Sequence, residues 1–140
     1  MQDNANHIHP QLLDDTHPLL VHEHCHIRVH RNATLPWAIL IPPAECVEFC
    51  DLTTHQQLHI TRLSRLIGDH FKRHMGAEKI NFAAIGNVVQ QLHIHVIGRH
   101  RKDPLWPDVV WGRTLPQKHW TEASLAQLKA GISATMQDLD

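Results

Sequence analysis

The run of residues 91–97 reads Gln-Leu-His-Ile-His-Val-Ile and alternates polar with apolar residues. A period of two is typical of a strand with two unlike faces. The apolar residues of this run are predicted to point into a core. The row on the opposite face then consists of Gln91, His93 and His95. By the same parity, Arg99 falls on the face of the histidines.

The residues before this run indicate a partner strand. Gly86-Asn87 is a turn signal, and it separates an upstream strand, predicted over residues 79–85, from a second strand over residues 89–99. The two strands are predicted to form a hairpin. Because Gly86 has no side chain, backbone N–H groups there can approach an anion closely. A turn glycine without any ligand explains the same residue equally well.

A long helix is predicted over residues 54–74. Thr53 and Gln56 have the spacing of a capping box at its start, and Gly76 lies near its C-terminal cap. Leu63, Leu66, Ile67 and Phe71 then recur at helical spacing. The basic residues of this helix are predicted to form its solvated face: Arg62, Arg65, Lys72 and Arg73. A second helix is predicted over residues 122–137, opening at Thr121.

The remaining elements complete a single domain. Strands are predicted over residues 19–31 and 35–42, with one helical turn over residues 10–16. Clustered strands with a long intervening helix and a terminal helix indicate an α+β fold. The 140 residues have the length of one domain. Within it, residues 1–9 are predicted to be a loose N-terminal tail and residues 113–140 a C-terminal helical extension.

The paired histidines give the strongest functional signal. An imidazole can act near neutral pH as a nucleophile, a general acid or base, or a metal ligand, and a strand holds it more rigidly than a loop does. A neutral imidazole can attack phosphorus, which negative oxygens shield, without adding another anion. Covalent catalysis then divides a difficult displacement into two easier steps. A solvated strand face that happens to carry two histidines is the plain structural alternative.

Residues 86–99 resemble the histidine triad (HIT) family of nucleotide hydrolases and transferases. The family motif is His-φ-His-φ-His-φ-φ, where φ is apolar. The spacing and every apolar position fit, and Gln91 stands at the first histidine. The resemblance covers roughly residues 25–112, because a proline-led apolar strand and a long helix precede the motif in the family order. The tail around Trp106 and Trp111 resembles a bacterial subgroup with glutamine at the first histidine.

This resemblance implies a HIT-like antiparallel sheet with one long central helix and a C-terminal helix. It also implies catalytic roles for His93, His95 and Gln91. His93 is expected to attack phosphorus and form a nucleotidyl-histidine, which water then cleaves. Its second ring nitrogen must be held by an acceptor, expected to be a backbone carbonyl. His95 is expected to help bind the phosphate and the leaving group. The chemistry needs no metal and no other cofactor.

Binding roles follow from the same resemblance. Phosphate binding is expected at Asn87, Gly86 and Asn81. In the family an early strand and the loop after it hold the base and ribose, which points to Asn32 and Trp37 for nucleoside binding. The expected function is hydrolysis of nucleotide phosphoanhydrides or phosphoramidates, such as dinucleoside polyphosphates or AMP derivatives.

Three positions depart from the family pattern and favour an alternative. Gln91 can position a group but cannot change charge in this pH range. Val88 replaces a serine or threonine that touches the leaving group in many members, and Ala38 replaces a further histidine. A nucleotide-binding regulatory module with little turnover is therefore the first alternative, because a fold does not fix a function.

A metal-binding protein is the second alternative. Three histidines alternate along the strand predicted over residues 19–31 and would share one face: His22, His24 and His26. Cys46 and Cys50 are spaced for one face of a helix. These residue types bind zinc and nickel, but a tight Cys-x-x-Cys pair is missing. The role of small apolar fillers is the favoured interpretation of the two cysteines.

Composition limits the partners. The formal net charge is -1, from 13 basic and 14 acidic residues, so no large basic footprint for nucleic acid is expected. The sequence has no apolar stretch long enough for a membrane span. The polar N-terminus lacks a signal-peptide pattern, and an odd number of cysteines fits a reducing compartment. We therefore expect a cytoplasmic protein whose partner is a nucleotide substrate.

The tail over residues 103–112 is rich in proline and tryptophan. Exposed large aromatic residues usually mark a contact surface, and packing over the core is the plainer reading. Dimers are common in the resembled family, which implies a homodimer. Trp106 or Trp111 is therefore hypothesised to shape either the site or the dimer interface.

Overall fold

One antiparallel sheet of five strands organises the fold. The computed structural model describes residues 5–43, 45 and 47–139. The strands lie across the sheet in the order β1-β2-β3-β5-β4, and each strand is antiparallel to its neighbours. Their bounds are Thr16–His22 for β1, Cys25–His30 for β2, Trp37–Ile41 for β3, Lys79–Ala83 for β4 and Ile94–Arg99 for β5.

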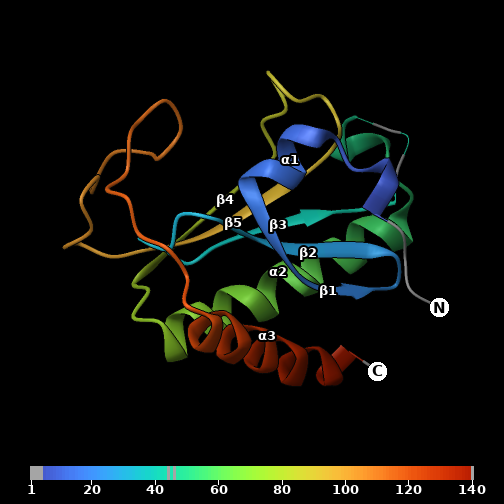
Figure 1. The fold of residues 1–140 in the computed structure, drawn as a ribbon. Coiled ribbons are helices and arrows are strands. Elements are labelled where there is room, and N and C mark those ends of the chain that lie inside the picture. Colours follow the sequence, from blue (N-terminus) through green and yellow to red (C-terminus); the bar gives the residue numbers. More distant parts are fainter. Residues whose placement is uncertain (1–4, 44, 46, 140) are drawn as a thin grey trace.

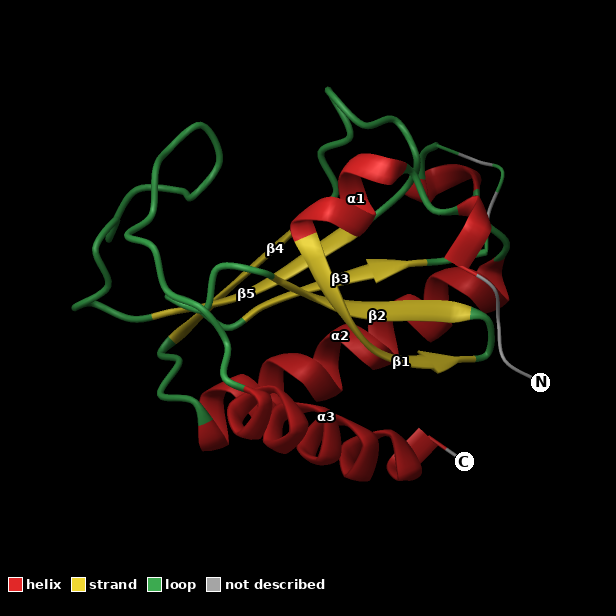
Figure 2. Ribbon diagram, in the orientation of Figure 1, coloured by secondary structure: helices red, strands yellow, loops and turns green. Residues whose placement is uncertain are grey.

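The helices cover both faces of this sheet unequally. Figure 1 shows α2 (Thr54–His74) and α3 (Glu122–Met136) together on one side and α1 (Pro10–Asp15) on the other. Figure 2 shows that long loops share the side of α1. Short 3-10 turns lie at Ala5–His7, Phe49–Asp51 and Gln137–Leu139. The predicted α+β class is confirmed.

Local capping chemistry fixes the two long helices where the sequence predicts them. The hydroxyl of Thr53 accepts the N–H of Gln56 at 3.1 Å, and the Gln56 side chain accepts the N–H of Thr53 at 3.0 Å. These bonds satisfy donors that a helix N-terminus otherwise leaves unpaired. Thr121 and Ser124 form the same reciprocal pair at the start of α3. The α3 helix ends at Met136, one residue before the predicted end.

The larger core lies between the sheet and the two long helices. Leu92, Ile94 and Val96 belong to it, which confirms the predicted core side of the histidine run. The buried stripe of α2 packs against them through Ile60, Leu63, Leu66, Ile67 and Phe71. Burying one such side chain stabilises the fold by roughly 1.5–3 kcal/mol. This core holds the sheet rigid beneath the opposite face, where the histidines lie.

A smaller core forms on that opposite face. Trp37 and Ile97 contribute to it from the sheet, Ile8 and Leu12 from the N-terminal segment, and Val110 from the tail. Ile8 is only 3% exposed. The N-terminal segment of residues 5–9 therefore packs over this face of the sheet through Ile8. The sequence gives no sign of this, because a lone isoleucine among polar residues has no periodicity.

Two strands replace the single strand predicted over residues 19–31. β1 and β2 pair as a hairpin whose turn is formed by Glu23 and His24, with φ angles of 45° and 66°. The left-handed region normally favours glycine or asparagine. The turn therefore lacks the residues that mark a turn in a sequence, and the prediction missed it. As a consequence, His24 lies in the turn. The register pairs His22 with Cys25 and Val21 with His26, so His22 and His26 lie on opposite faces of the sheet.

The predicted hairpin of β4 and β5 forms, but with a longer connection. Asn81 pairs with Ile97 and Ala83 with His95. β5 begins at Ile94, not at residue 89, and residues 84–93 form an irregular loop. His95 therefore lies on a strand, whereas Gln91 and His93 lie in the loop that leads into it. Among the described residues, no helix is both long enough and apolar enough to cross a membrane.

Candidate active site

His95 lies in the middle of the sheet and His93 at the entrance to its strand. The register places His95 between Ile39 of β3 and Ala83 of β4. The rings of His93 and His95 meet edge to face, with centroids 5.0 Å apart. Each residue is only 7% exposed. The two rings therefore form a single buried unit on the face that α1 and the tail cover.

The backbone fixes the protonation of His93. Its Nδ1 lies 2.7 Å from the main-chain oxygen of Gln91. A carbonyl oxygen only accepts hydrogen bonds, so Nδ1 must carry the proton. In the neutral ring, Nε2 then bears a lone pair. The expectation that a backbone carbonyl holds the second nitrogen matches this contact, and it leaves Nε2 without a proton in the neutral ring.

His95 is held in the opposite tautomer. The indole Nε1 of Trp37 donates to its Nδ1 at 2.9 Å. Burial, assisted by the nearby rings of His93 and His30, lowers the pKa of His95 to about 4. The ring is therefore neutral at physiological pH, with its proton on Nε2. The site thus pairs one imidazole lone pair with one imidazole N–H donor.

A wall of aromatic rings surrounds this pair. His30 stacks on Trp37 with centroids 4.3 Å apart, and Trp111 packs edge-on against both Trp37 and His95. The Asn32 N–H donates to Nδ1 of His30 at 3.1 Å, which orients that ring. Of the two tail tryptophans, Trp111 is the one that contacts the histidine pair.

The loop of residues 84–93 supplies the edge of the site. Gly86 has a φ of 65°, a conformation that glycine adopts without strain. It lines a shallow hollow together with Leu92 and His93. Asn87 is exposed beside it, and Val88 is 95% exposed. Of the predicted phosphate-binding residues, Gly86 is thus the one that lines the same hollow as His93.

Gln91 is engaged by the N-terminal segment. Its Oε1 accepts the His9 N–H at 2.7 Å, and its Nε2 donates to the His7 carbonyl at 3.0 Å. The oxygen and the nitrogen of the side-chain amide are therefore both hydrogen-bonded to backbone groups, which lie 82 and 84 residues away in the sequence. The glutamine thus fastens the cover over the site, while its own carbonyl orients His93.

Arg99 brings no free positive charge to the site. Its guanidinium binds both carboxylate oxygens of Asp103, at 2.7 and 2.9 Å, and this pair is almost fully buried. Burial opposes the charged carboxylate, but hydrogen bonds from Arg99, Leu105 and His100 outweigh it and lower the pKa of Asp103 to about 2. Arg99 also donates to the Asn81 side-chain oxygen at 3.1 Å. In this structure Asn81 therefore anchors the arginine.

The two predicted nucleoside-binding residues lie in different surroundings. Trp37 is buried beside His95. The Asn32 amide donates to the Pro116 carbonyl at 2.9 Å and accepts the Thr34 N–H at 3.0 Å. Asn32 therefore ties the loop after β2 to the tail. The structure brings Trp37 to the histidines directly and Asn32 only through His30.

Several contributors to the site were missed from the sequence. His30 stacks on Trp37, Asp103 binds Arg99, and the backbone of His7 and His9 holds Gln91. A usable signal existed for His30, because His26, Arg28 and His30 alternate along β2 on the sheet face that carries His95. Once the hairpin turn is placed at Glu23 and His24, the alternation predicts that these three polar side chains share one face of the second strand.

The predicted metal face of three histidines does not form. His24 lies in the turn, and His26 instead packs edge-on against His7 at 5.2 Å between centroids. Cys46 lies outside the described residues. Cys50 is exposed in a 3-10 turn.

The family model of the HIT domain matches residues 14–102, which is more than half of the chain. The chain belongs to the histidine triad family. A histidine triad protein from Sinorhizobium meliloti has a similar structure, with 36% identity, a TM-score of 0.83, and coverage of 91% of this chain and 95% of that one. For a histidine triad protein from Marinobacter aquaeolei the identity is 34%, the TM-score 0.84 and the coverage 95% and 97%.

A third histidine triad protein, from Bradyrhizobium japonicum, is 29% identical with a TM-score of 0.79 and covers 91% of this chain and 96% of its own. No curated protein matches the chain. The expected HIT-like sheet with its central helix is therefore confirmed. Membership relates the chain to a family of nucleotide-binding proteins that includes nucleotide hydrolases and transferases.

Proposed function

We propose that this chain hydrolyses nucleotide phosphoanhydrides or phosphoramidates through a nucleotidyl-histidine on His93. The observation that carries the proposal is the 2.7 Å contact between His93 Nδ1 and the Gln91 carbonyl. In the neutral ring it places the lone pair on Nε2, the atom available for attack. His93 also borders the hollow of Gly86, where backbone N–H groups can meet phosphate oxygens.

The proposed reaction has two steps. In the first, Nε2 of His93 forms a bond to the α-phosphorus while the bond from phosphorus to the leaving group breaks. In the second, water attacks the nucleotidyl-histidine, and the nucleoside monophosphate leaves with the imidazole regenerated. Negative charge grows on the phosphate oxygens in each step. The Nε2–H of His95 stabilises that charge as a hydrogen-bond donor.

The site favours substrates with good leaving groups. A neutral His95 donates a hydrogen bond but does not readily give up its proton, and Gln91 cannot act as an acid. The charge of Arg99 is already neutralised by Asp103. Phosphoanhydrides meet this condition because their leaving group is a stable anion. Phosphoramidates meet it once their nitrogen has taken up a proton from water, so that the P–N bond breaks with release of a neutral amine.

Substrate access requires part of the cover to move. His93 and His95 are each 7% exposed, and the N-terminal segment is tied to Gln91 above them. Displacing the loop of residues 84–93 or the segment of residues 5–9 would open the Nε2 side of His93. Asn87, on that exposed loop, would then reach the phosphate, while Trp37 would line the base.

A nucleotide-binding module with little turnover is the second candidate. The structure favours it at two positions, because Val88 points into solvent and Ala38 packs in the helix-side core. Neither supplies a polar group at the site. Tight AMP binding without a covalent adduct would distinguish this module from the enzyme.

The decisive experiment is to trap the adduct. Wild-type protein is incubated with adenosine 5′-phosphoramidate or a dinucleoside polyphosphate, quenched, and analysed by peptide mass spectrometry. A nucleotidyl group on His93 is expected, and His93→Ala is expected to lose at least about 1000-fold in kcat/KM. His74→Ala is the matched control, because His74 lies exposed on α2. Equal activity of His93→Ala and wild type would refute the nucleophile.

We also propose that the chain represents a subgroup of the family with glutamine at the first motif position. We further propose that the protein is cytoplasmic and has no nucleic-acid or membrane partner. Finally, we propose that it forms a homodimer. The edge strand β4 supports a dimer, because it carries Phe82 at 56% exposure. Sedimentation at micromolar concentration tests the dimer, and a monomer would count against it.

A further inference from the structure

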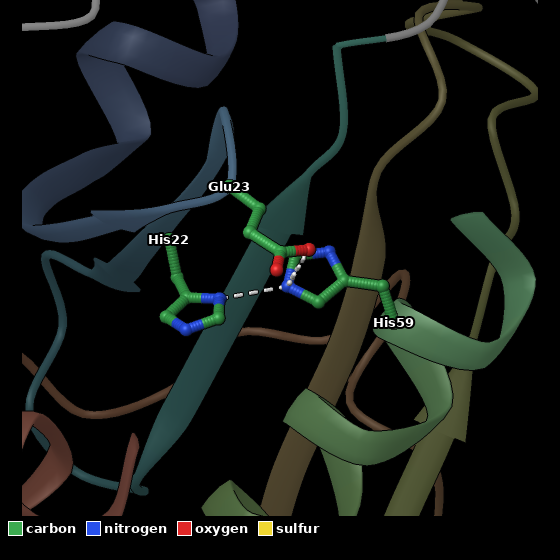
Figure 3. Close-up of side chains that lie close together, drawn as sticks. All are labelled: His22, Glu23 and His59. Carbon is green, nitrogen blue, oxygen red and sulfur yellow. Dashed lines mark hydrogen bonds and ion pairs between the residues drawn. The ribbon is translucent and has the colours of Figure 1, made fainter. Parts of the chain in front are cut away.

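A second histidine cluster lies at the turn between β1 and β2. His22 ends β1, Glu23 begins the turn, and His59 projects from α2. Figure 3 shows the three side chains pointing toward one another. One ligand atom from each lies within 4.8 Å of those of the other two. Within the described part of the chain, this is the one group of three such residues with that geometry.

The distances are close to those of an ion site. His22 Nδ1 lies 2.8 Å from His59 Nε2, and Glu23 Oε2 lies 3.7 Å from the same His59 atom. Ligand atoms at about 2.1 Å from a tetrahedral ion are about 3.4 Å apart. A bound ion would therefore need the two imidazoles to separate by roughly half an ångström. The histidine side chains can provide that shift by small rotations.

Two imidazoles and one carboxylate form a donor set with a clear preference. Zinc binds histidine nitrogen and carboxylate oxygen, and three protein ligands leave a fourth position open to water. We propose that His22, Glu23 and His59 bind one divalent transition-metal ion, Zn²⁺ in the first instance. The ion would join the β1–β2 turn to the first half of α2.

The surroundings support a neutral His59 ligand. Its side chain is only 12% exposed, whereas that of Glu23 is 54% exposed, so the ion would sit at the rim of the fold. Burial lowers the pKa of His59 despite the Glu23 carboxylate, and the charges of His22, His55 and Arg62 act in the same direction as burial. The neutral ring is the form that binds metal.

Two neighbours modulate the site. His55 Nε2 lies 3.6 Å from Glu23 Oε2 and one helical turn from His59, so it can supply the fourth ligand. Arg62 lines the same hollow and opposes a cation. Solvent weakens that repulsion because the arginine is exposed.

This inference is independent of the proposed hydrolase. No residue of the cluster is one of the residues placed around His93 and His95. A measurement of zinc binding at the turn therefore tests this inference whether or not the protein turns over nucleotides.

The test measures binding of Zn²⁺ alone to untagged, metal-free protein by isothermal titration calorimetry. One ion per chain is expected for wild type. His59→Ala and His22→Ala are each expected to bind on the order of 100-fold more weakly. Arg62→Ala is expected to bind roughly threefold more tightly, because a repulsive charge is removed. A purely structural role of the cluster would not produce that gain.

His74→Ala provides the matched control, because it removes an exposed histidine from the His70–His74 pair on the same helix. Its zinc affinity is expected to equal that of wild type. If an alanine variant does not fold, Glu23→Gln replaces it as the test, because this change lies on the exposed turn. Glu23→Gln should weaken zinc binding by on the order of tenfold. Zinc should also raise the Tm of wild type more than that of Glu23→Gln.

Three outcomes would overturn the proposal. They are the absence of a stoichiometric site, an affinity that is the same in wild type and the cluster variants, or an equal loss of affinity in His74→Ala. The last result would indicate adventitious binding by the many surface histidines.

Discussion

The indole of Trp37 donates a 2.9 Å hydrogen bond to Nδ1 of His95. An indole N–H is only a donor, so this contact requires a lone pair on Nδ1 and places the proton of the neutral ring on Nε2. The Gln91 carbonyl imposes the opposite arrangement on His93. The two neutral rings therefore differ at Nε2, where His93 has a lone pair and His95 has an N–H group.

Replacing Trp37 by phenylalanine is expected to weaken this division of roles. Without the indole donor, the neutral form of His95 loses a stabilising bond, so the pKa of His95 should rise. Loss of the fixed tautomer should lower kcat by about tenfold. Titration of the His95 ring by NMR and steady-state kinetics measure the two effects. Trp106→Phe is the matched control, because Trp106 lies away from the histidine pair.

The depressed pKa of His95 makes stability depend on pH. Its folded pKa is about 4, below the ordinary value of 6.5. The unfolded chain therefore binds more protons between these values, so stability is complete above pH 6.5 and is lost as the pH falls toward 4. Between pH 7.5 and 5 this residue alone should account for a loss of about 2 kcal/mol in the free energy of unfolding.

Urea denaturation of wild type and His95→Gln at both pH values checks this expectation. The variant lacks the titrating ring, so its loss of stability between pH 7.5 and 5 should be smaller than that of wild type. The other histidines titrate in both proteins and cancel in the comparison. Identical pH dependence of the two proteins would show that His95 titrates normally.

The buried pair of Arg99 and Asp103 is expected to be essential for stability. Asp103→Asn leaves a guanidinium buried without its counter-charge, which should cost about 3–5 kcal/mol of unfolding free energy. Arg101→Ala changes an exposed arginine that pairs with Glu78 at 3.6 Å. Surface pairs of that kind are worth roughly 0–1 kcal/mol. Thermal unfolding of the two variants should differ accordingly, and equal Tm values would contradict a structural role for the buried pair.

Gln91→Ala is expected to loosen the N-terminal cover. The change removes two hydrogen bonds to backbone groups of His7 and His9, worth about 1–2 kcal/mol together. Cleavage of the segment of residues 5–9 by a nonspecific protease should become faster. Gln90→Ala, an exposed neighbour, controls for the loss of a glutamine from the same loop. If both variants are cleaved at the wild-type rate, Gln91 does not hold the cover.

Local patterns were sufficient for much of the fold and for the core of the candidate site. The capping box of Thr53 and Gln56 fixed the start of α2, because that signal lies within four residues. The period of two before Ile97 separated the core side from the histidine side. The turn signal of Gly86-Asn87 predicted the pairing of β4 with β5, although the predicted start of β5 was five residues too early.

Other features depended on contacts between distant parts of the chain. The turn of Glu23 and His24 has no glycine to mark it, so its hairpin was read as one strand. That error also hid the approach of His22 to His59, which are 37 residues apart. The role of Gln91 depends on backbone groups more than 80 residues away.

The sequence by itself determined the helices, the strand faces and the identity of the two histidines, because each depends on the chemistry of neighbouring residues. Only the tertiary structure decided which ring nitrogen carries each proton, what covers the histidines and which residues gather at the β1–β2 turn. Those outcomes depend on long-range hydrogen bonds and burial, which no local pattern of polar and apolar residues encodes.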